Sequence, residues 1–267
     1  MVELLRANLV AHLTFYRRSR LLLAFLILFA VLTALATVPQ FFVDSGVQNF
    51  NKLQEIFGTI NFFLKLLAAG LGLFIVSAHL RSRNLKMVFT KPCPPWIWLG
   101  SAFLSAVSVA FLLNAVVLGG VTALSVLWHL PVRSGLAFVA ADTFVISIGL
   151  AAYLMLLATI VHPAIAAIVA IIFNADLFYD GFVWARSAIH AGNHSTGTRV
   201  LEDVFHVLYL AAPILHPFSR KTANIYVSLR VMHGEWKYLL YSLGYSLALS
   251  AFCCLIALSA LQRKRHI

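Results

Sequence analysis

The sequence contains few charged residues. Asp, Glu, Lys and Arg together make up 11% of its 267 residues, against about 25% in an average soluble domain. Hydrophobic residues make up 61% of the chain, and the mean hydropathy is +0.91. Polar side chains are therefore too few to cover a soluble globule of this size. This balance excludes an ordinary soluble domain and favours a membrane protein.

Cysteine, proline and glycine are also scarce. With 3 Cys, 8 Pro and 14 Gly, the chain is neither a disulfide-stapled domain nor a collagenous or disordered one. Cys93, Cys253 and Cys254 have no CxxC or Cys/His zinc spacing. The apolar residues form long runs rather than an alternating pattern, which favours membrane-spanning helices over a β-barrel.

Acidic residues are fewer than half as numerous as basic ones. The chain has 9 Asp and Glu against 20 Lys and Arg, so its net charge is +11. In a membrane protein such an excess is typical of segments that flank the spans, so we expect no nucleic-acid-binding surface. The P-loop pattern GxxxxGK(S/T) is absent too, which excludes a phosphate-binding loop of that kind.

Six long apolar runs predict an all-α, polytopic membrane protein with one transmembrane domain over residues 1–267. An amphipathic helix over residues 1–20 precedes them, and we expect it to lie at the membrane interface. The first run ends in Ala34-Leu35-Ala36, which resembles a signal-peptide cleavage site, so a cleaved signal peptide is the alternative to an anchor. The predicted spans are 21–38, 61–79, 96–128, 135–160, 164–183 and 237–261.

The basic residues predict that both termini are cytoplasmic. Segments 1–20, 80–95 and 262–267 are rich in Lys and Arg, whereas the short loops on the other side hold only Lys52 and Arg133. The five tryptophans all fall at ends of predicted spans, where aromatic side chains prefer the interface. Both patterns agree on six spans.

The outer segment 184–236 is not a simple loop. An apolar helix pattern runs to residue 215 and is interrupted by Pro213. This helix is too short to span a membrane. We expect it to be a re-entrant or surface helix that shields the outer mouth of the protein.

The inner segment 80–95 carries the most specific signal. Its apolar residues lie at helical spacing on one face, and its basic residues lie away from that face. Prolines end the helix before the next span. One interpretation is a basic loop that only fixes topology; the other is a helix that docks into a groove of a cytoplasmic partner. The residues assigned to docking are Arg81, Arg83, Leu85, Lys86, Val88, Phe89 and Pro92.

The order of these elements resembles that of the type-2 ABC transporter permeases, the ABC-2 family. In that family an interfacial helix precedes six spans, and a short charged helix that ends in proline lies between spans two and three. The residues that match the family pattern here are Leu85, Phe89, Thr90, Pro92 and Leu99-Gly100.

The resemblance implies a permease subunit of an ABC exporter in a bacterial inner membrane. Segment 80–95 is then the coupling helix, two permease copies pair, and ATP and Mg²⁺ bind to a separate ATPase chain. The mechanism that the resemblance implies is alternating access. The apolar walls of the chain fit a hydrophobic or amphipathic substrate, such as a lipid, a peptide or a hydrophobic drug. This chain itself then has no catalytic residue and binds no cofactor.

Ionisable and polar residues inside the predicted spans are candidates for the substrate path. Asp176 and Asp180 are four residues apart, so their carboxylates share a helix face. The alternative is that the charged candidates, all in the outer third of a span, reach water or pair with one another. We expect Asn114 to bond another helix. The candidates are Lys65, Asn114, Asp142, Asp176 and Asp180.

Two other classes of function stay open. An ATP-independent secondary transporter or channel needs charges near the membrane midplane. A membrane-embedded enzyme or assembly factor needs converging His and carboxylate groups, for which only the region of His190 and His194 qualifies. We expect no metal there, because Gly192 and Asn193 disfavour a helix between the two histidines.

Overall fold

The computed structural model describes residues 2–18, 20, 23, 27, 30–31, 46–81, 94–173, 175–190 and 196–265. All regular elements within these ranges are helices, so the all-α prediction is confirmed for this part of the chain. They are α1 (Val2–Arg18), α3 (Gly46–Arg81), α5 (Pro95–Leu127), α6 (Ser134–Ile160), α7 (Pro163–Ile172), α8 (Ala175–His190), α9 (Thr196–Ala211), α10 (Ser219–Ser228) and α11 (Trp236–Arg265).

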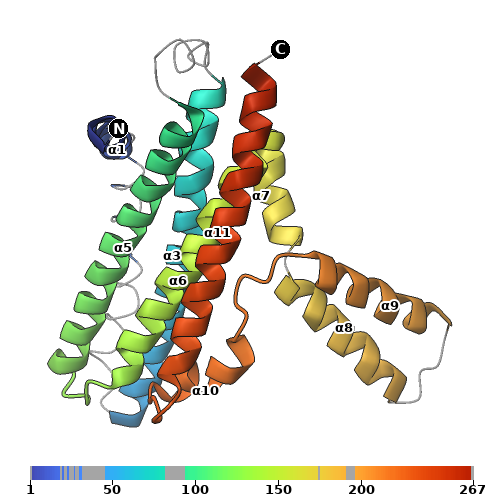
Figure 1. The fold of residues 1–267 in the computed structure, drawn as a ribbon. Coiled ribbons are helices and arrows are strands. Elements are labelled where there is room, and N and C mark those ends of the chain that lie inside the picture. Colours follow the sequence, from blue (N-terminus) through green and yellow to red (C-terminus); the bar gives the residue numbers. More distant parts are fainter. Residues whose placement is uncertain are drawn as a thin grey trace.

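Helices α3, α5, α6 and α11 are long and apolar enough to cross a membrane. They form a bundle in which α6 packs against the other three (Figure 1). Prolines mark two helix starts, Pro95 in α5 and Pro163 in α7, because proline fits the first turn of a helix. The four helices correspond to the predicted spans 61–79, 96–128, 135–160 and 237–261.

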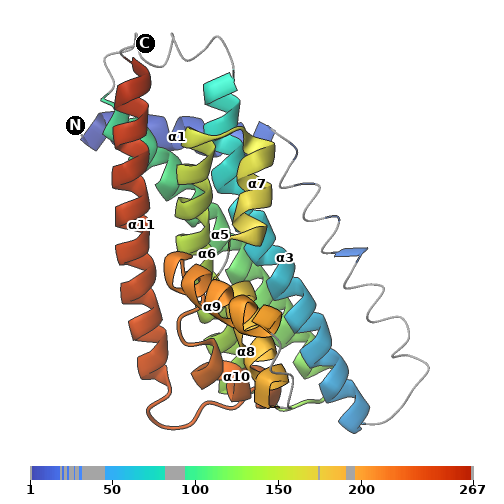
Figure 2. The ribbon, with the colours of Figure 1, turned by 90° about the vertical axis from the view of Figure 1, so that its right-hand side faces the viewer.

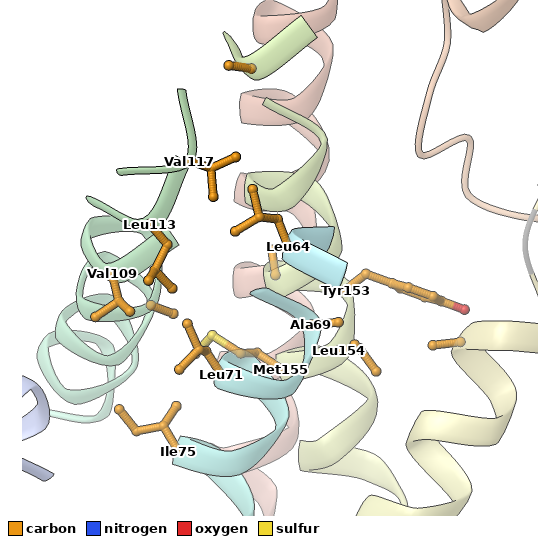
Figure 3. Packing of buried hydrophobic residues seen from close by; sticks show 14 of the residues in the cluster. Leu64, Ala69, Leu71, Ile75, Val109, Leu113, Val117, Tyr153, Leu154 and Met155 are labelled. Atoms are coloured by element: carbon orange, nitrogen blue, oxygen red, sulfur yellow. The ribbon is translucent and has the colours of Figure 1, made fainter. Parts of the chain in front are cut away.

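Helices α3, α5 and α6 share one apolar core. Leu71 of α3, Leu113 of α5 and Met155 of α6 lie together in it (Figure 3). At Gly72 a Cβ would lie 2.6 Å from the Ala151 carbonyl oxygen, so α3 approaches α6 this closely only because the position is glycine. The core therefore fixes α3 tightly to α6.

Two parts of the predicted topology are not matched by a described helix. The predicted first span, 21–38, lies outside the described residues except for 23, 27, 30 and 31. Of the predicted docking residues, Arg81 ends α3 and the others, Arg83, Leu85, Lys86, Val88, Phe89 and Pro92, lie outside the described residues. The docking helix therefore stays a prediction.

The prediction of one continuous fifth span over residues 164–183 is wrong. The structure divides this stretch into α7 and α8. At about 1.5 Å per residue, α7 extends only about 15 Å, half the thickness of the hydrocarbon layer. The helix ends because Phe173, with a ψ of 69°, leaves the helical conformation, and the chain continues as α8, which packs mainly on α9.

Helix α1 lies across one end of the bundle, at a steep angle to the long helices (Figure 2). The buried Tyr16 hydroxyl donates to the Leu71 carbonyl oxygen of α3 at 2.9 Å, and the His12 ring meets the Trp98 ring of α5 edge to face. The C-terminus lies at the same end, which we call the terminal end; α10 lies at the other, the α10 end (Figure 1). The predicted N-terminal helix is confirmed, and its contact with the membrane surface stays a prediction.

Helices α8 and α9 form a hairpin that projects sideways from the bundle (Figure 1). Gly181 of α8 lets the Phe205 ring of α9 approach, since a Cβ there would lie 3.0 Å from that ring. Phe182 stacks on His206 with ring centroids 5.2 Å apart. The apolar helix predicted in segment 184–236 is therefore α9, and it ends two residues before Pro213.

Candidate functional site

The most unusual side chain in the bundle is Asp142, an acid on α6 with a relative exposure of 1%. His216 Nε2 lies 2.8 Å from Asp142 Oδ2, and the Tyr226 hydroxyl donates to the same oxygen at 2.8 Å. A buried carboxylate is stable only when such donors compensate for its lost hydration. These three residues are the centre of the candidate site, which we call the Asp142 cluster.

The cluster joins three segments that are far apart in the sequence. Asp142 lies about two turns into α6, His216 in the connection between α9 and α10, and Tyr226 in α10. Two further bonds hold the end of α10 on the start of α6: Arg133 donates to the Ser228 carbonyl oxygen at 2.6 Å, and the Gly135 amide to the Leu229 carbonyl oxygen at 3.0 Å. Of these contacts, the bonds to Asp142 lie furthest along α6 from its first residue.

The bonds to Asp142 Oδ2 need a hydrogen atom from each partner. An ionised carboxylate only accepts, so the His216 tautomer that completes this bond carries its hydrogen on Nε2. Burial, and then the charge of Asp142, raise the pKa of Tyr226 well above its ordinary value, so its phenol stays a donor. Lys65 of α3 adds a positive charge, with Nζ 5.9 Å from the centroid of the Tyr226 ring.

Helix α3 begins earlier than the sequence predicts. It starts at Gly46 rather than near residue 61, and its apolar stretch runs over Phe50–Ala78, so Lys65 falls near the middle of that stretch. The depth of Lys65 in a membrane stays a prediction. Its Nζ lies beside the ring of Tyr226, which bonds Asp142 about two turns into α6. The structure therefore brings a basic side chain to the Asp142 cluster.

An open cavity of about 530 Å³ adjoins the cluster. The residues that line it come from α8, α9, the connection after α9, and α10, and His216 is one of them. The His216 side chain is 15% exposed and thus links the cavity to the buried Asp142. Other residues of the lining are Tyr179, Asp180, Tyr209, Phe218 and Lys221.

The other predicted site residues lie apart from this cluster. Asn114 is buried in α5, and its amide donates to the Ala110 carbonyl oxygen of its own helix at 2.9 Å. The predicted bond from Asn114 to another helix is therefore not found among the described residues. The side chain of Asp176 lies outside the described residues, whereas Asp180 lines the cavity.

The described residues contain no group of three His, Cys, Asp or Glu side chains that could hold a metal ion. His190 Nδ1 lies 2.7 Å from the Arg186 carbonyl oxygen, one turn back on α8. His194 lies outside the described residues. Sequence reasoning missed His216 and Tyr226, because they are 74 and 84 residues from Asp142 and follow no local pattern.

Comparison with protein-family models, with curated proteins and with solved structures finds no match to this chain. Function must therefore be inferred from the chemistry and position of its own residues. The features that carry this inference are the basic terminal end, the Asp142 cluster and the cavity beside it.

Proposed function

We propose that the chain is the membrane subunit of an ABC exporter and moves an amphipathic or hydrophobic substrate. The observation that carries this proposal is the arrangement of the terminal end. Helix α1, the end of α3, the start of α5 and the end of α11 all lie there, and the segments 1–20, 80–95 and 262–267 are basic in sequence. By the positive-inside tendency this end faces the cytoplasm, where an ATPase would dock.

The terminal end is mechanically joined to the candidate site. Tyr16 bonds α1 to α3, and α3 is packed tightly on α6 at Gly72. Lys65 and Asp142 lie further along these same two helices. A force applied at the terminal end therefore reaches the Asp142 cluster through rigid helices rather than through loops.

The proposed mechanism is alternating access. ATP closes a pair of separate ATPase chains, the 80–95 segments of two permease copies move together, and the long helices repack. ATP shifts this equilibrium only as far as it binds the closed state more tightly. Asp142, Lys65 and the cavity residue Asp180 line the proposed substrate path, as intramembrane ionisable residues do in transporters.

A second function is favoured by one specific observation. Lys65 of α3 approaches the ring of Tyr226, whose hydroxyl bonds the buried Asp142 of α6, so a base and an acid of two apolar helices lie close together. An ion- or proton-coupled transporter that needs no ATPase requires such a pair. The two functions differ in one measurable respect. Only the first requires a second chain that hydrolyses ATP.

The variants Arg83→Glu and Phe89→Ala test the proposed function. Each removes a proposed docking contact of segment 80–95, so ATP-driven transport should fall about tenfold, which corresponds to about 1.4 kcal/mol of docking free energy. Transport and ATP hydrolysis are measured together in proteoliposomes, and elution volume checks the fold. Lys52→Glu, at the α10 end, is the control and should leave both rates unchanged. Unchanged coupling in both docking variants would refute the assignment of this segment.

A further inference from the structure

The cavity beside the Asp142 cluster carries two charges of opposite sign. Asp180 of α8 and Lys221 of α10 both line it, and both are exposed. Neither side chain forms an ion pair or a hydrogen bond within the part of the chain that the structure describes. Because the acid and the base share one cavity without neutralising each other, both charges are available to a ligand.

Aromatic rings form much of the remaining lining. Tyr179 of α8 and Tyr209 of α9 pack edge to face with centroids 5.5 Å apart, and Phe218 tilts against Tyr238 of α11 at 5.8 Å. Tyrosine rings attract cations and pack on methylene groups. Since Tyr179 precedes Asp180 on α8, a cationic group beside this acid has aromatic neighbours as well.

Two features hold the polar side of the cavity in place. His216 lines the cavity, and its Nε2 is fixed by the buried Asp142. Pro217 follows it directly and also lines the cavity, which stiffens this connection between α9 and α10. A volume of about 530 Å³ falls within the usual range of small-molecule sites, roughly 300–1,000 Å³.

We propose that this cavity binds the headgroup of an amphipathic zwitterion. The cationic group of the ligand lies by Asp180 and the two tyrosines, and its anionic group lies by Lys221. This inference deepens the proposed function by naming a substrate class, and it rests on that function only for movement of the ligand, not for its binding. A ligand with one charge leaves either Asp180 or Lys221 uncompensated.

Binding is tested on the purified full chain in maltoside detergent, without an ATPase. Ligand-observed NMR gives the Kd of octylphosphocholine, octyltrimethylammonium, octyl phosphate and octyl glucoside, which share a tail and differ in charge. We expect the zwitterion to bind at least about tenfold tighter than either single-charge compound, which is about 1.4 kcal/mol. Equal affinity of all four probes would overturn the proposal.

Two variants test which charged group of the ligand lies by Asp180 and which lies by Lys221. Asp180→Asn should weaken the binding of the zwitterion and of the cation about tenfold and leave the binding of the anion unchanged. Lys221→Gln should weaken the binding of the zwitterion and of the anion about tenfold and leave the binding of the cation unchanged. The matched controls are Asp203→Asn on α9 and Lys237→Gln on α11, which lie outside the cavity lining. If the control variants change the affinities as much as the cavity variants, the site is refuted.

Failure of this inference and failure of the proposed function are separable. Zwitterion binding in a chain with no ATPase partner supports the site and contradicts the exporter. If binding does not depend on charge but the chain does stimulate an ATPase, the result refutes the site and supports the exporter. A zwitterion that the complex carries across vesicles is the substrate, whereas one that stays bound is a resident lipid; both outcomes support the site.

Discussion

Replacing Asp142 with alanine is expected to lower the free energy of unfolding by about 3 kcal/mol. The substitution leaves two partly buried donors, the His216 imidazole and the Tyr226 hydroxyl, without their acceptor. An unsatisfied buried donor costs about 1–3 kcal/mol, so two such donors together account for about 3 kcal/mol. Because both donors come from the α9–α10 region, this region should detach from α6 first.

The loss of stability is measured as the temperature at which the detergent-solubilised chain loses its monodisperse elution peak. For a chain of this length, about 3 kcal/mol corresponds to roughly 6–12 °C. Asp203→Ala removes an exposed acid from α9 and is the matched control, with an expected change of about 0.5 kcal/mol or less. Equal melting temperatures for the Asp142 and Asp203 variants would show that the cluster contributes nothing.

Replacing Gly135 with alanine is expected to be nearly as damaging, although it adds only one methyl group. A Cβ at Gly135 would overlap the main chain of Leu229, which cannot rotate away as a side chain can. Leu229 is itself held in the left-handed region, with a φ of 50°, and its side chain is buried. The substitution must therefore push α10 off α6, at a cost of about 1–3 kcal/mol.

The control for this variant is Gly119→Ala, in the exposed part of α5, where an added Cβ meets no atom within 4 Å. There alanine should be neutral or stabilising by about 0.5–1 kcal/mol, because it favours the helix over the unfolded chain. The same thermal measurement compares the two variants. A Gly135 variant as stable as the Gly119 variant would contradict the tight attachment of α10 to α6.

The long helices were predictable because their signal is local. An apolar run long enough to span a bilayer has one physical explanation, and Pro94, Pro95 and Pro163 mark the starts of α5 and α7. Helix α1 was also predictable from a local pattern, because its apolar residues recur on one helix face and its polar residues fall on the other. Among the site residues, the sequence singled out Asp142 and Asp180, since acids in apolar stretches are rare.

The remaining features depend on contacts that no local pattern encodes. The break at Phe173 has no proline or glycine, so hydropathy continues across it. His216 and Tyr226 acquire their role only when α10 folds back onto α6. The start of α3 at Gly46 was missed, because the stretch from residue 46 to residue 60 is polar enough to be mistaken for a loop.

The central claim is that this chain couples to a separate ATPase. The most direct measurement is gentle purification of the full chain, expressed with its neighbouring genes, followed by mass spectrometry and an ATP hydrolysis assay of the eluted material. We expect an ATPase chain to co-elute in a 1:1 ratio and the complex to hydrolyse ATP. A chain that elutes alone and still carries solute across liposomes would contradict the claim and make Lys65 and Asp142 the centre of an ATP-independent transporter.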